Sequence, residues 1–267
     1  MKLTKIALST VVASTLLIAA EPDLKKDDAF VTHTELGYIE TSGNTKTKTF
    51  NLDAEVKKGW GKNIFALTFD AQYADDDGVE NKNKFLIELE YDYEITDRFA
   101  FDYLIGYKED RFSGFDNQLY TGPGVKYKAI VSEKHNLSTE GNILYAVDNY
   151  ESVYTDANGD VVGYPNADNV PTTLKTASYS DDYMAYRLKG VYSWQMLENL
   201  KFDQELSIRG SFEESNNYFV FSKTAFTSKI SDIFSAGVSY KVDYVNQPAD
   251  GKVSTDRTFT VNLIVDY

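Results

Sequence analysis

The sequence contains no cysteine, which excludes disulfide bonds, thiolate metal sites and a lipid anchor on a processed N-terminal cysteine. Proline is scarce, with 5 residues in 267. Beyond the N-terminus, no segment offers about 18 consecutive apolar residues, so the sequence predicts no transmembrane helix. Basic residues number 27 against 41 acidic ones, a net charge of −14. This charge argues against nucleic acid as a partner, because phosphate-binding surfaces are basic.

Aromatic residues are plentiful, with 20 Tyr and 16 Phe. Tyrosine is amphipathic and is enriched where a membrane meets water. The mean hydropathy is negative, at −0.39. A strand of a membrane barrel is only half apolar, so a negative mean hydropathy does not exclude such a barrel. The composition therefore favours a β protein and leaves a membrane location open.

The last eleven residues alternate between large apolar and mostly polar side chains. The apolar positions are Phe259, Val261, Leu263, Val265 and Tyr267. This period-two pattern predicts a strand with one apolar face. Bacterial outer-membrane barrels characteristically end in this way, and the alternative is the last strand of a soluble β protein. We interpret the five residues as an assembly signal that the barrel-assembly machinery recognises.

The same alternation recurs from Phe30 to the end of the sequence and predicts about twelve strands. Their expected ranges are 30–41, 46–58, 62–74, 82–95, 98–111, 117–131, 136–149, 182–195, 200–213, 217–229, 233–246 and 257–267. Short connections alternate with longer ones, among them an acidic loop from Asp75 to Gly78. The longest, residues 151–180, is polar and shows no clear pattern. Pro123, between two glycines, predicts a bulge or a kink.

A large apolar face repeated in about ten strands is difficult to bury inside one soluble barrel, whose wide lumen would have to be filled. The same face needs no packing partner when it contacts lipid, and closing the sheet removes the edges that lipid does not tolerate. The sequence therefore predicts an all-β fold over residues 30–267. The expected fold is a transmembrane antiparallel up-and-down β-barrel with short periplasmic turns and longer extracellular loops, of which 151–180 is the longest.

The N-terminus carries the features of a secretory signal peptide over residues 1–20. Lys2 and Lys5 provide positive charge, and the apolar run that follows is too short to span a membrane. Residues 21–29 are charged and are interpreted as a periplasmic lead-in. Together these features predict a protein of the bacterial outer membrane after signal-peptide cleavage, in contact with membrane lipid and lipopolysaccharide, and a monomer.

Two segments resemble a known family. One is Leu36-Gly37-Tyr38 followed by Thr41-Ser42-Gly43-Asn44-Thr45, and the other runs from Asp110 to Asp116 and is followed by Gly122, Gly124 and Tyr127. They are similar to motifs of the salt-induced outer-membrane protein family, the YdiY-like group with a domain of unknown function. Gln118 and Pro123 depart from the pattern of that family. The resemblance implies an outer-membrane barrel with a link to salt or osmotic stress, and it implies no substrate or catalytic residue.

The polar faces of the strands predict a mixed but acidic lumen. The candidate selectivity residues are Asp53, Glu55, Glu88, Glu90, Asp92, Asp102, Lys126 and Arg209. Rings of carboxylates bias a pore toward cations, which predicts a small cation-preferring channel. The alternative is a non-conducting barrel whose lumen is filled by its own salt bridges and whose external loops bind a ligand or a cation. Both remain open at this point.

Catalysis is not expected. The sequence contains 2 histidines, His33 and His135, and both fall in the periplasmic part of the predicted barrel, away from the outer surface. An outer-membrane hydrolase is therefore the third hypothesis, and no cofactor is predicted. The segment Asp156 to Asp160 has oxygen-bearing residues at a spacing that suggests Ca²⁺, but it lacks the distal glutamate of a calcium loop. A solvated loop is the expected alternative.

Overall fold

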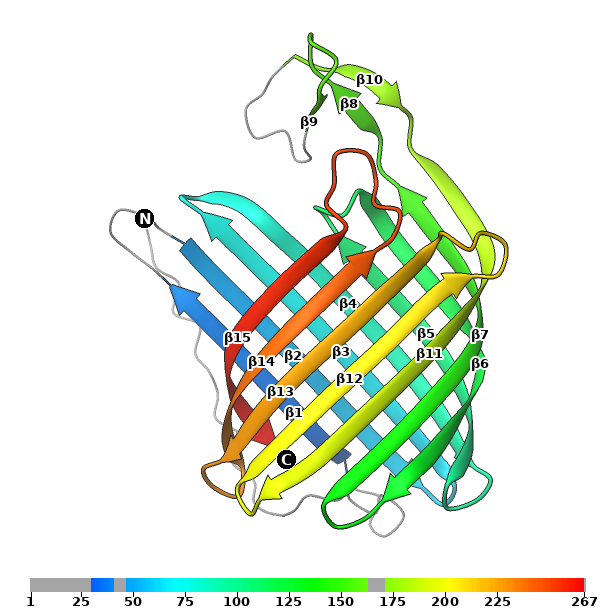
Figure 1. Cartoon of the computed structure of the whole chain (residues 1–267), viewed down its shortest axis with the longest axis vertical. Coiled ribbons are helices and arrows are strands. Elements are labelled where there is room, and N and C mark those ends of the chain that lie inside the picture. The colour runs from blue at the N-terminus through cyan, green and yellow to red at the C-terminus, as the bar shows by residue number, and fades with distance from the viewer. Residues whose placement is uncertain (1–29, 41–46, 163–170, 267) are drawn as a thin grey trace.

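The computed structural model of the chain describes residues 30–40, 47–162 and 171–266. Within these residues, twelve antiparallel strands form one closed barrel (Figure 1). Consecutive barrel strands are neighbours in the sheet, and the first strand pairs with the last, with Leu36 opposite Leu263. No described segment forms a helix that is long and apolar enough to span a membrane. The predicted up-and-down barrel is confirmed.

The strand boundaries agree with the predicted ranges to within a few residues. The barrel consists of β1 (Phe30–Glu40), β2 (Thr47–Trp60), β3 (Asn63–Asp76), β4 (Val79–Glu94), β5 (Phe99–Asp110), β6 (Phe115–Val131), β7 (His135–Tyr150), β11 (Tyr179–Leu197), β12 (Leu200–Ser211), β13 (Tyr218–Lys229), β14 (Phe234–Val245) and β15 (Thr255–Asp266).

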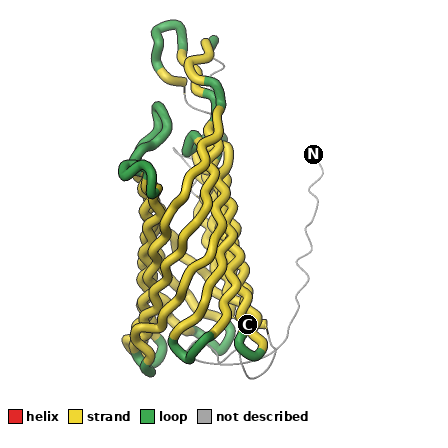
Figure 2. The backbone as a smooth tube through the Cα atoms, turned by 90° about the vertical axis from the view of Figure 1, so that its right-hand side faces the viewer, coloured by secondary structure: helices red, strands yellow, loops and turns green. Residues whose placement is uncertain are grey.

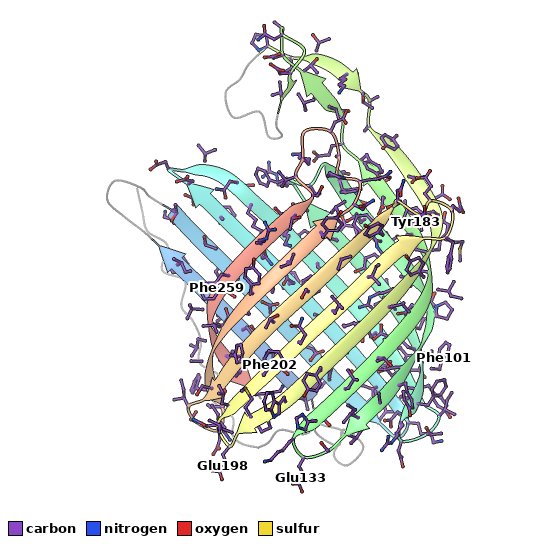
Figure 3. The ribbon with its side chains drawn as sticks, in the orientation of Figure 1. Phe101, Glu133, Tyr183, Glu198, Phe202 and Phe259 are labelled. Carbon is purple, nitrogen blue, oxygen red and sulfur yellow. The ribbon has the colours of Figure 1, made fainter. Side chains whose placement is uncertain are left out.

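Apolar side chains cover the outer face of the barrel, and polar ones line the lumen. In β15, Phe259, Val261 and Leu263 are 57%, 54% and 49% exposed on the outside. The residues between them, Thr260 and Asn262, are buried. Figure 3 shows Phe101 and Phe259 on this aromatic outer surface. The outward face predicted for the terminal strand is thus observed, and Tyr267 lies outside the described residues.

The two ends of the barrel differ in their connections. At one end, which we call the short-turn end, the five described turns contain two to four residues each. The opposite, long-loop end includes the connections 111–114, 212–217 and 246–254.

The sequence predicted an acidic loop from Asp75 to Gly78 at this end, and that prediction is wrong. Strands β3 and β4 continue to a two-residue turn, Asp77-Gly78, whose φ angles of 50° and 83° are those that a tight hairpin requires.

The longest connection contains a second small sheet. Strand β8 (Val153–Thr155) pairs with β9 (Val161–Val162) on one side and with β10 (Thr173–Thr176) on the other. Figure 1 shows this sheet above the barrel, where β7 and β11 rise toward it. The sequence did not reveal these strands, because they are too short to show an alternation.

The barrel is flattened, with a broad face in Figure 1 and a narrow profile in Figure 2. Flattening brings the lumen sides of opposite walls close enough for side chains to meet. One part of the lumen is filled by an apolar cluster that the sequence analysis missed. Its members come from β5, β6, β7 and β11 and are Leu104, Tyr120, Leu144, Ala146, Tyr183 and Ala185.

Glycines on β6 allow β7 to approach closely. A Cβ atom at Gly122 would lie 2.1 Å from the carbonyl oxygen of Ile143.

Pro123, next to Gly122, was expected to produce a bulge or a kink. The described pairing with β7 is interrupted around Pro123, but it resumes at Gly124 without a shift in register, so the expected bulge is wrong. The bulges of β6 lie nearer its two ends.

We expect Gly122→Ala to destabilise the barrel by about 1–3 kcal/mol, because the new methyl group would overlap backbone that cannot move aside. Gly190→Ala is the matched control, since nothing lies within 4 Å of a Cβ atom at that position. Urea unfolding in lipid vesicles, followed by the heat-dependent gel shift of the folded barrel, measures both. Equal stabilities for the two variants would contradict the close approach of β6 to β7.

Candidate functional site in the barrel lumen

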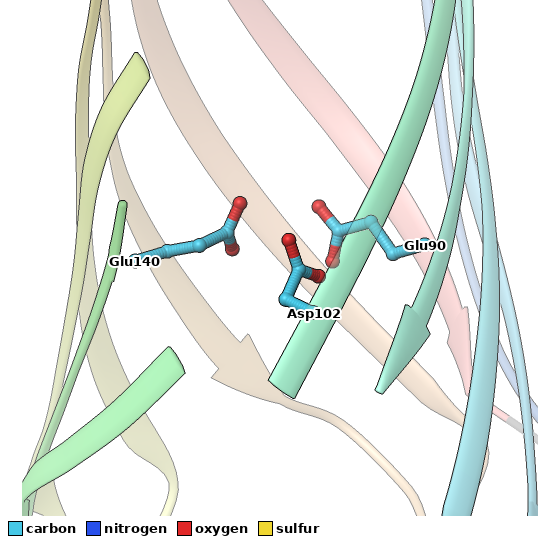
Figure 4. A group of neighbouring side chains, drawn as sticks. All are labelled: Glu90, Asp102 and Glu140. Carbon is cyan, nitrogen blue, oxygen red and sulfur yellow. The ribbon is translucent and has the colours of Figure 1, made fainter. Parts of the chain in front are cut away.

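Three lumenal carboxylates form the densest acidic group in the described part of the barrel. Glu90 of β4, Asp102 of β5 and Glu140 of β7 point toward one another in Figure 4, and one oxygen of each lies within 4.8 Å of the others. We call this trio the carboxylate cluster. Asp102 is fully buried, and Glu140 is nearly so. Like charges this close in a desolvated lumen repel strongly, so the trio requires neighbouring cations or protons.

The strand register builds the cluster. Asp92, Asp102, Gly124, Asn142 and Arg187 lie opposite one another in a row across five adjacent strands. Because Gly124 has no side chain, Asn142 reaches over β6 and donates a hydrogen bond from Nδ2 to Asp102. A Cβ atom at Gly124 would lie 2.2 Å from that nitrogen. The glycine thus permits the contact that orients Asp102.

Three basic side chains surround the carboxylate cluster. Lys126 Nζ lies 3.1 Å from Glu90 and 3.8 Å from Glu140. Arg187 donates to Glu140 and also lies 3.8 Å from Glu90. Lys189 reaches Glu90 at 3.8 Å. These cations come from β6 and β11, so the cluster joins strands up to four places apart around the ring.

The basic side chains do not satisfy every buried oxygen. Oδ1 of Asp92, Oδ1 of Asp102 and Oδ1 of Asn142 are buried without a hydrogen-bond partner. Buried polar atoms are nearly always paired in native proteins, and an unpaired oxygen is costly in a desolvated site. Carboxylate and amide oxygens are the ligands that hard cations prefer. The residues therefore fit a small cation better than they fit any nucleophilic or redox chemistry.

A second set of ion pairs links the opposite part of the lumen. Lys241 of β14 is 2% exposed and bonds Asp53 of β2, at 2.6 Å, and Asp70 of β3. Lys84 of β4 pairs with Asp243 of β14 at 2.6 Å, although the two strands are five places apart around the ring of twelve. We call these the Lys241 network. Such pairs cross the lumen and connect facing walls.

The structure brings together most, but not all, of the candidate selectivity residues. Those in or next to the carboxylate cluster are Glu88, Glu90, Asp92, Asp102 and Lys126, and Asp53 belongs to the Lys241 network. Glu55 lies apart and pairs with its strand neighbour Lys57 at 3.0 Å. Arg209 also lies apart, 3.6 Å from Asp148, with its guanidinium over the rings of Tyr120 and Phe219.

Other lumenal residues were missed in the sequence. They are Asp70, Glu140, Asn142, Arg187, Lys189 and Lys241. Each stands at a polar position of its strand's alternation, so the parity of the strand would have placed it in the lumen. The parity does not identify its partner on another wall.

The two histidines have structural partners. His33 Nδ1 lies 2.5 Å from Asp266 Oδ1, which links β1 to β15 where the barrel closes. His135 Nδ1 lies 2.8 Å from the hydroxyl of Tyr192 and its ring stacks on Trp194. The backbone of His135 also exchanges hydrogen bonds with the hydroxyl of Ser132, at 2.8 and 2.9 Å.

The suggested calcium segment is a turn between β8 and β9. Asp156 Oδ1 accepts hydrogen bonds from the backbone N–H groups of Asn158, at 2.8 Å, and Asp160, at 3.0 Å. The bond from Asp160 above all holds the pKa of Asp156 below its usual value. This carboxylate caps its own turn, as Asx turns do.

We expect Arg187→Gln to destabilise the folded barrel by about 3–5 kcal/mol, because buried carboxylates would lose their partner. The double variant Arg187→Gln with Glu140→Gln should recover much of that loss, since it removes a buried negative charge as well. Urea unfolding in vesicles gives both free energies. A single variant as stable as the parent protein would show that the pairing is unimportant.

Similar folds are found among barrels of bacterial outer membranes. The translocator domain of the autotransporter NalP from Neisseria meningitidis has a TM-score of 0.50 at 9% identity, with 91% of each chain covered. The NanC porin has a TM-score of 0.47 at 10% identity, covering 90% of this chain and all of that one. At these identities the likeness concerns the fold alone. The chain shares the closed β-barrel fold of these outer-membrane proteins.

Relatives in sequence agree with this fold. The "Uncharacterized protein YdiY" of Escherichia coli (strain K12) is 23% identical over 231 residues, which cover 85% of this chain and 79% of that protein. The family model described as "Protein of unknown function, DUF481" matches residues 34–267. That match begins within β1 and runs through every later strand of the barrel, and it confirms the YdiY-like resemblance. The chain belongs to the DUF481 family.

Proposed function

We propose that the protein is a narrow outer-membrane channel for small cations. The observation that carries the proposal is the excess of buried carboxylates. Among the described residues, the buried acidic ones are Glu35, Glu88, Asp92, Glu94, Asp102, Asp110, Glu140 and Asp148, and the buried basic ones are Lys84, Arg187, Arg209 and Lys241. Eight carboxylates against four basic groups leave an excess of negative charge in the buried part of the lumen, and Lys126 and Lys189 beside Glu90 offset it only in part. Such a charge excess concentrates cations and repels anions.

The unpartnered oxygens support the carboxylate cluster as the selective part of the path. Asp92 and Asp102 each keep one free buried oxygen, and Lys126 Nζ is shared between Asp92, Glu90 and Glu140. A lysine ammonium on a flexible stem can exchange places with an inorganic cation more readily than a packed side chain can. Glu88, which pairs with Arg187, would then shape the field around this point, and Asp53 and Arg209 would act elsewhere in the lumen.

The crossed lumen supports a small conductance. Ion pairs such as Lys84 with Asp243 and the apolar cluster around Leu104 and Leu144 occupy the space between the walls. A hydrated oligosaccharide would have to break several buried contacts to pass. A single small cation needs only the displacement of one or two charged side chains. We therefore assign small cations, rather than large solutes, as the permeant class.

A second candidate function is a non-conducting barrel that serves as a scaffold for its external loops. The observation that favours it is the same set of buried ion pairs, because basic side chains that pair with lumenal carboxylates take the place of permeant cations. An enzymatic role has no supporting geometry among the described residues. Conductance separates the two candidates.

Several expectations about export accompany the proposal. Residues 1–20 are proposed to be removed as a signal peptide, and 21–29 to form the periplasmic lead-in; both lie outside the described residues. The outward face of β15 supports recognition by the barrel-assembly machinery, and the aromatic outer surface supports contact with membrane lipid and lipopolysaccharide as a monomer. The family resemblance is the support for a role under salt or osmotic stress.

Planar-bilayer recording of the refolded barrel tests the proposal. We expect small single-channel currents that favour K⁺ over Cl⁻ in a salt gradient. The triple variant Glu90→Gln, Asp102→Asn, Glu140→Gln should lose most of this preference, because it removes the carboxylate cluster. The control variant makes the same charge change on exposed short turns, with Glu133→Gln, Glu198→Gln and Asp232→Asn. It should retain the preference for K⁺ over Cl⁻.

Each result has a defined meaning. Absence of openings at any voltage would overturn the channel and favour the scaffold. Cation preference that persists unchanged in the folded triple variant would overturn the assignment of selectivity to the carboxylate cluster. The heat-dependent gel shift verifies that each variant is folded before recording.

A further inference from the structure

A cavity of about 700 Å³ lies at the long-loop end, where β6, β7 and β11 meet the segment that leads into β8. In Figure 1 the ends of β7 and β11 rise above the other strands at this place. The volume falls within the range of roughly 300–1,000 Å³ that is typical of small-molecule sites. The cavity is separate from the carboxylate cluster, with which it shares no residue.

Tyrosine rings form the apolar part of the cavity wall. Tyr150 and Tyr179 stack with ring centroids 4.4 Å apart and planes 9° apart. The ring of Phe115 also packs against Tyr150, with centroids 4.6 Å apart and planes tilted by 43°. Tyr179 is 53% exposed and Tyr154, also in the wall, is 41% exposed. The stack fixes one ring in place and leaves two aromatic surfaces available to a ligand.

Carboxyl and amide groups form the polar part of the wall. Asn149 donates to Asn117 at 2.8 Å, and Asn117 donates to Asp116 at 3.0 Å, so this row is held in one orientation. Glu151 adds a second carboxyl group. Among the described residues, those that line the cavity include no lysine or arginine.

Basic side chains nearby only partly offset this charge. Arg111 and Lys252 act electrostatically on Glu151 from outside the lining. Arg111 already pairs with Glu80 at 2.9 Å. The cavity therefore combines exposed aromatic rings with an acidic rim, on a protein whose net charge is −14.

We propose that this cavity binds an organic ammonium ion. Aromatic faces attract such cations through the ring quadrupole, and quaternary ammonium groups are bound in this way by aromatic cages. The carboxyl groups supply a favourable potential, and they disfavour anionic ligands such as acidic sugars. A bare inorganic cation would prefer the oxygen-only carboxylate cluster and would gain little from the tyrosine rings. This site does not depend on whether the lumen conducts.

Choline and its neutral carbon isostere, dimethylbutanol, test the proposal directly. The refolded full-length barrel, in a non-ionic detergent without a choline headgroup, is titrated with each probe by calorimetry. Choline should bind at least about tenfold more tightly than the isostere, because only choline carries the charge that the rings attract. Equal binding of the two probes, or no binding of choline, would overturn the proposal.

Variants test the assignment of residues. Tyr179→Leu and Glu151→Gln should each weaken choline binding severalfold, whereas Tyr179→Phe keeps the ring and should retain it. Tyr240→Leu, on the exposed outer face of β14, is the control and should leave binding unchanged. Full affinity in a folded Tyr179→Leu variant would overturn the site. The triple variant of the carboxylate cluster should bind choline normally, which separates this site from the lumen.

The ammonium group could come from a soluble compound or from a lipid headgroup. The same titration in vesicles of phosphatidylglycerol and of phosphatidylcholine distinguishes these sources. A lower apparent affinity for free choline in phosphatidylcholine would identify the headgroup as a competitor. Equal affinities would identify a soluble ligand, and both results support an ammonium site.

Discussion

The ion pairs that cross the lumen are the constraint on which this barrel depends. Flattening removes charged side chains of facing walls from water, and the effective penalty for a buried ion is several kcal/mol. Lys241 with Asp53 and Asp70, and Lys84 with Asp243, offset that penalty by pairing β14 with strands on the other wall. Because lumenal carboxylates outnumber the basic groups, pairing within the protein is incomplete. The remaining negative charge of the lumen would attract cations.

The wall itself imposes complementary requirements on its two faces. Outward residues such as Phe259 and Leu263 are exposed and would need no specific partner in a membrane, whereas each inward residue must fit one. Gly122 and Gly124 illustrate the inward requirement, since any side chain there would overlap β7 or displace Asn142. The narrow lumen that results suits small ions. Acidic groups at the cavity of the long-loop end have the same sign as the lumen, so both would attract cations.

Much of the fold was predictable because period-two alternation depends only on local chemistry. It gave twelve strands, their outward faces and the closure of β15 on β1. The Asp77-Gly78 turn was also predictable, since Asp-Gly is a hairpin signal, but the acidic residues around it suggested a loop.

The candidate site was less predictable than the fold. Strand parity places Glu90 and Asp102 in the lumen, yet the partner of Lys84 is 159 residues away and depends on flattening and stagger that no local pattern encodes. The signal peptide and Tyr267 lie outside the described residues and stay predictions.

A double-mutant cycle on Lys84 and Asp243 tests most directly whether the two walls are joined through the lumen. The free energy of unfolding in vesicles is measured for the parent protein, Lys84→Met, Asp243→Asn and the double variant. We expect a coupling energy of about 1.5 kcal/mol or more, as found for close buried charge pairs. Additive effects, with a coupling near zero, would mean that the side chains do not meet across the lumen and would contradict the account.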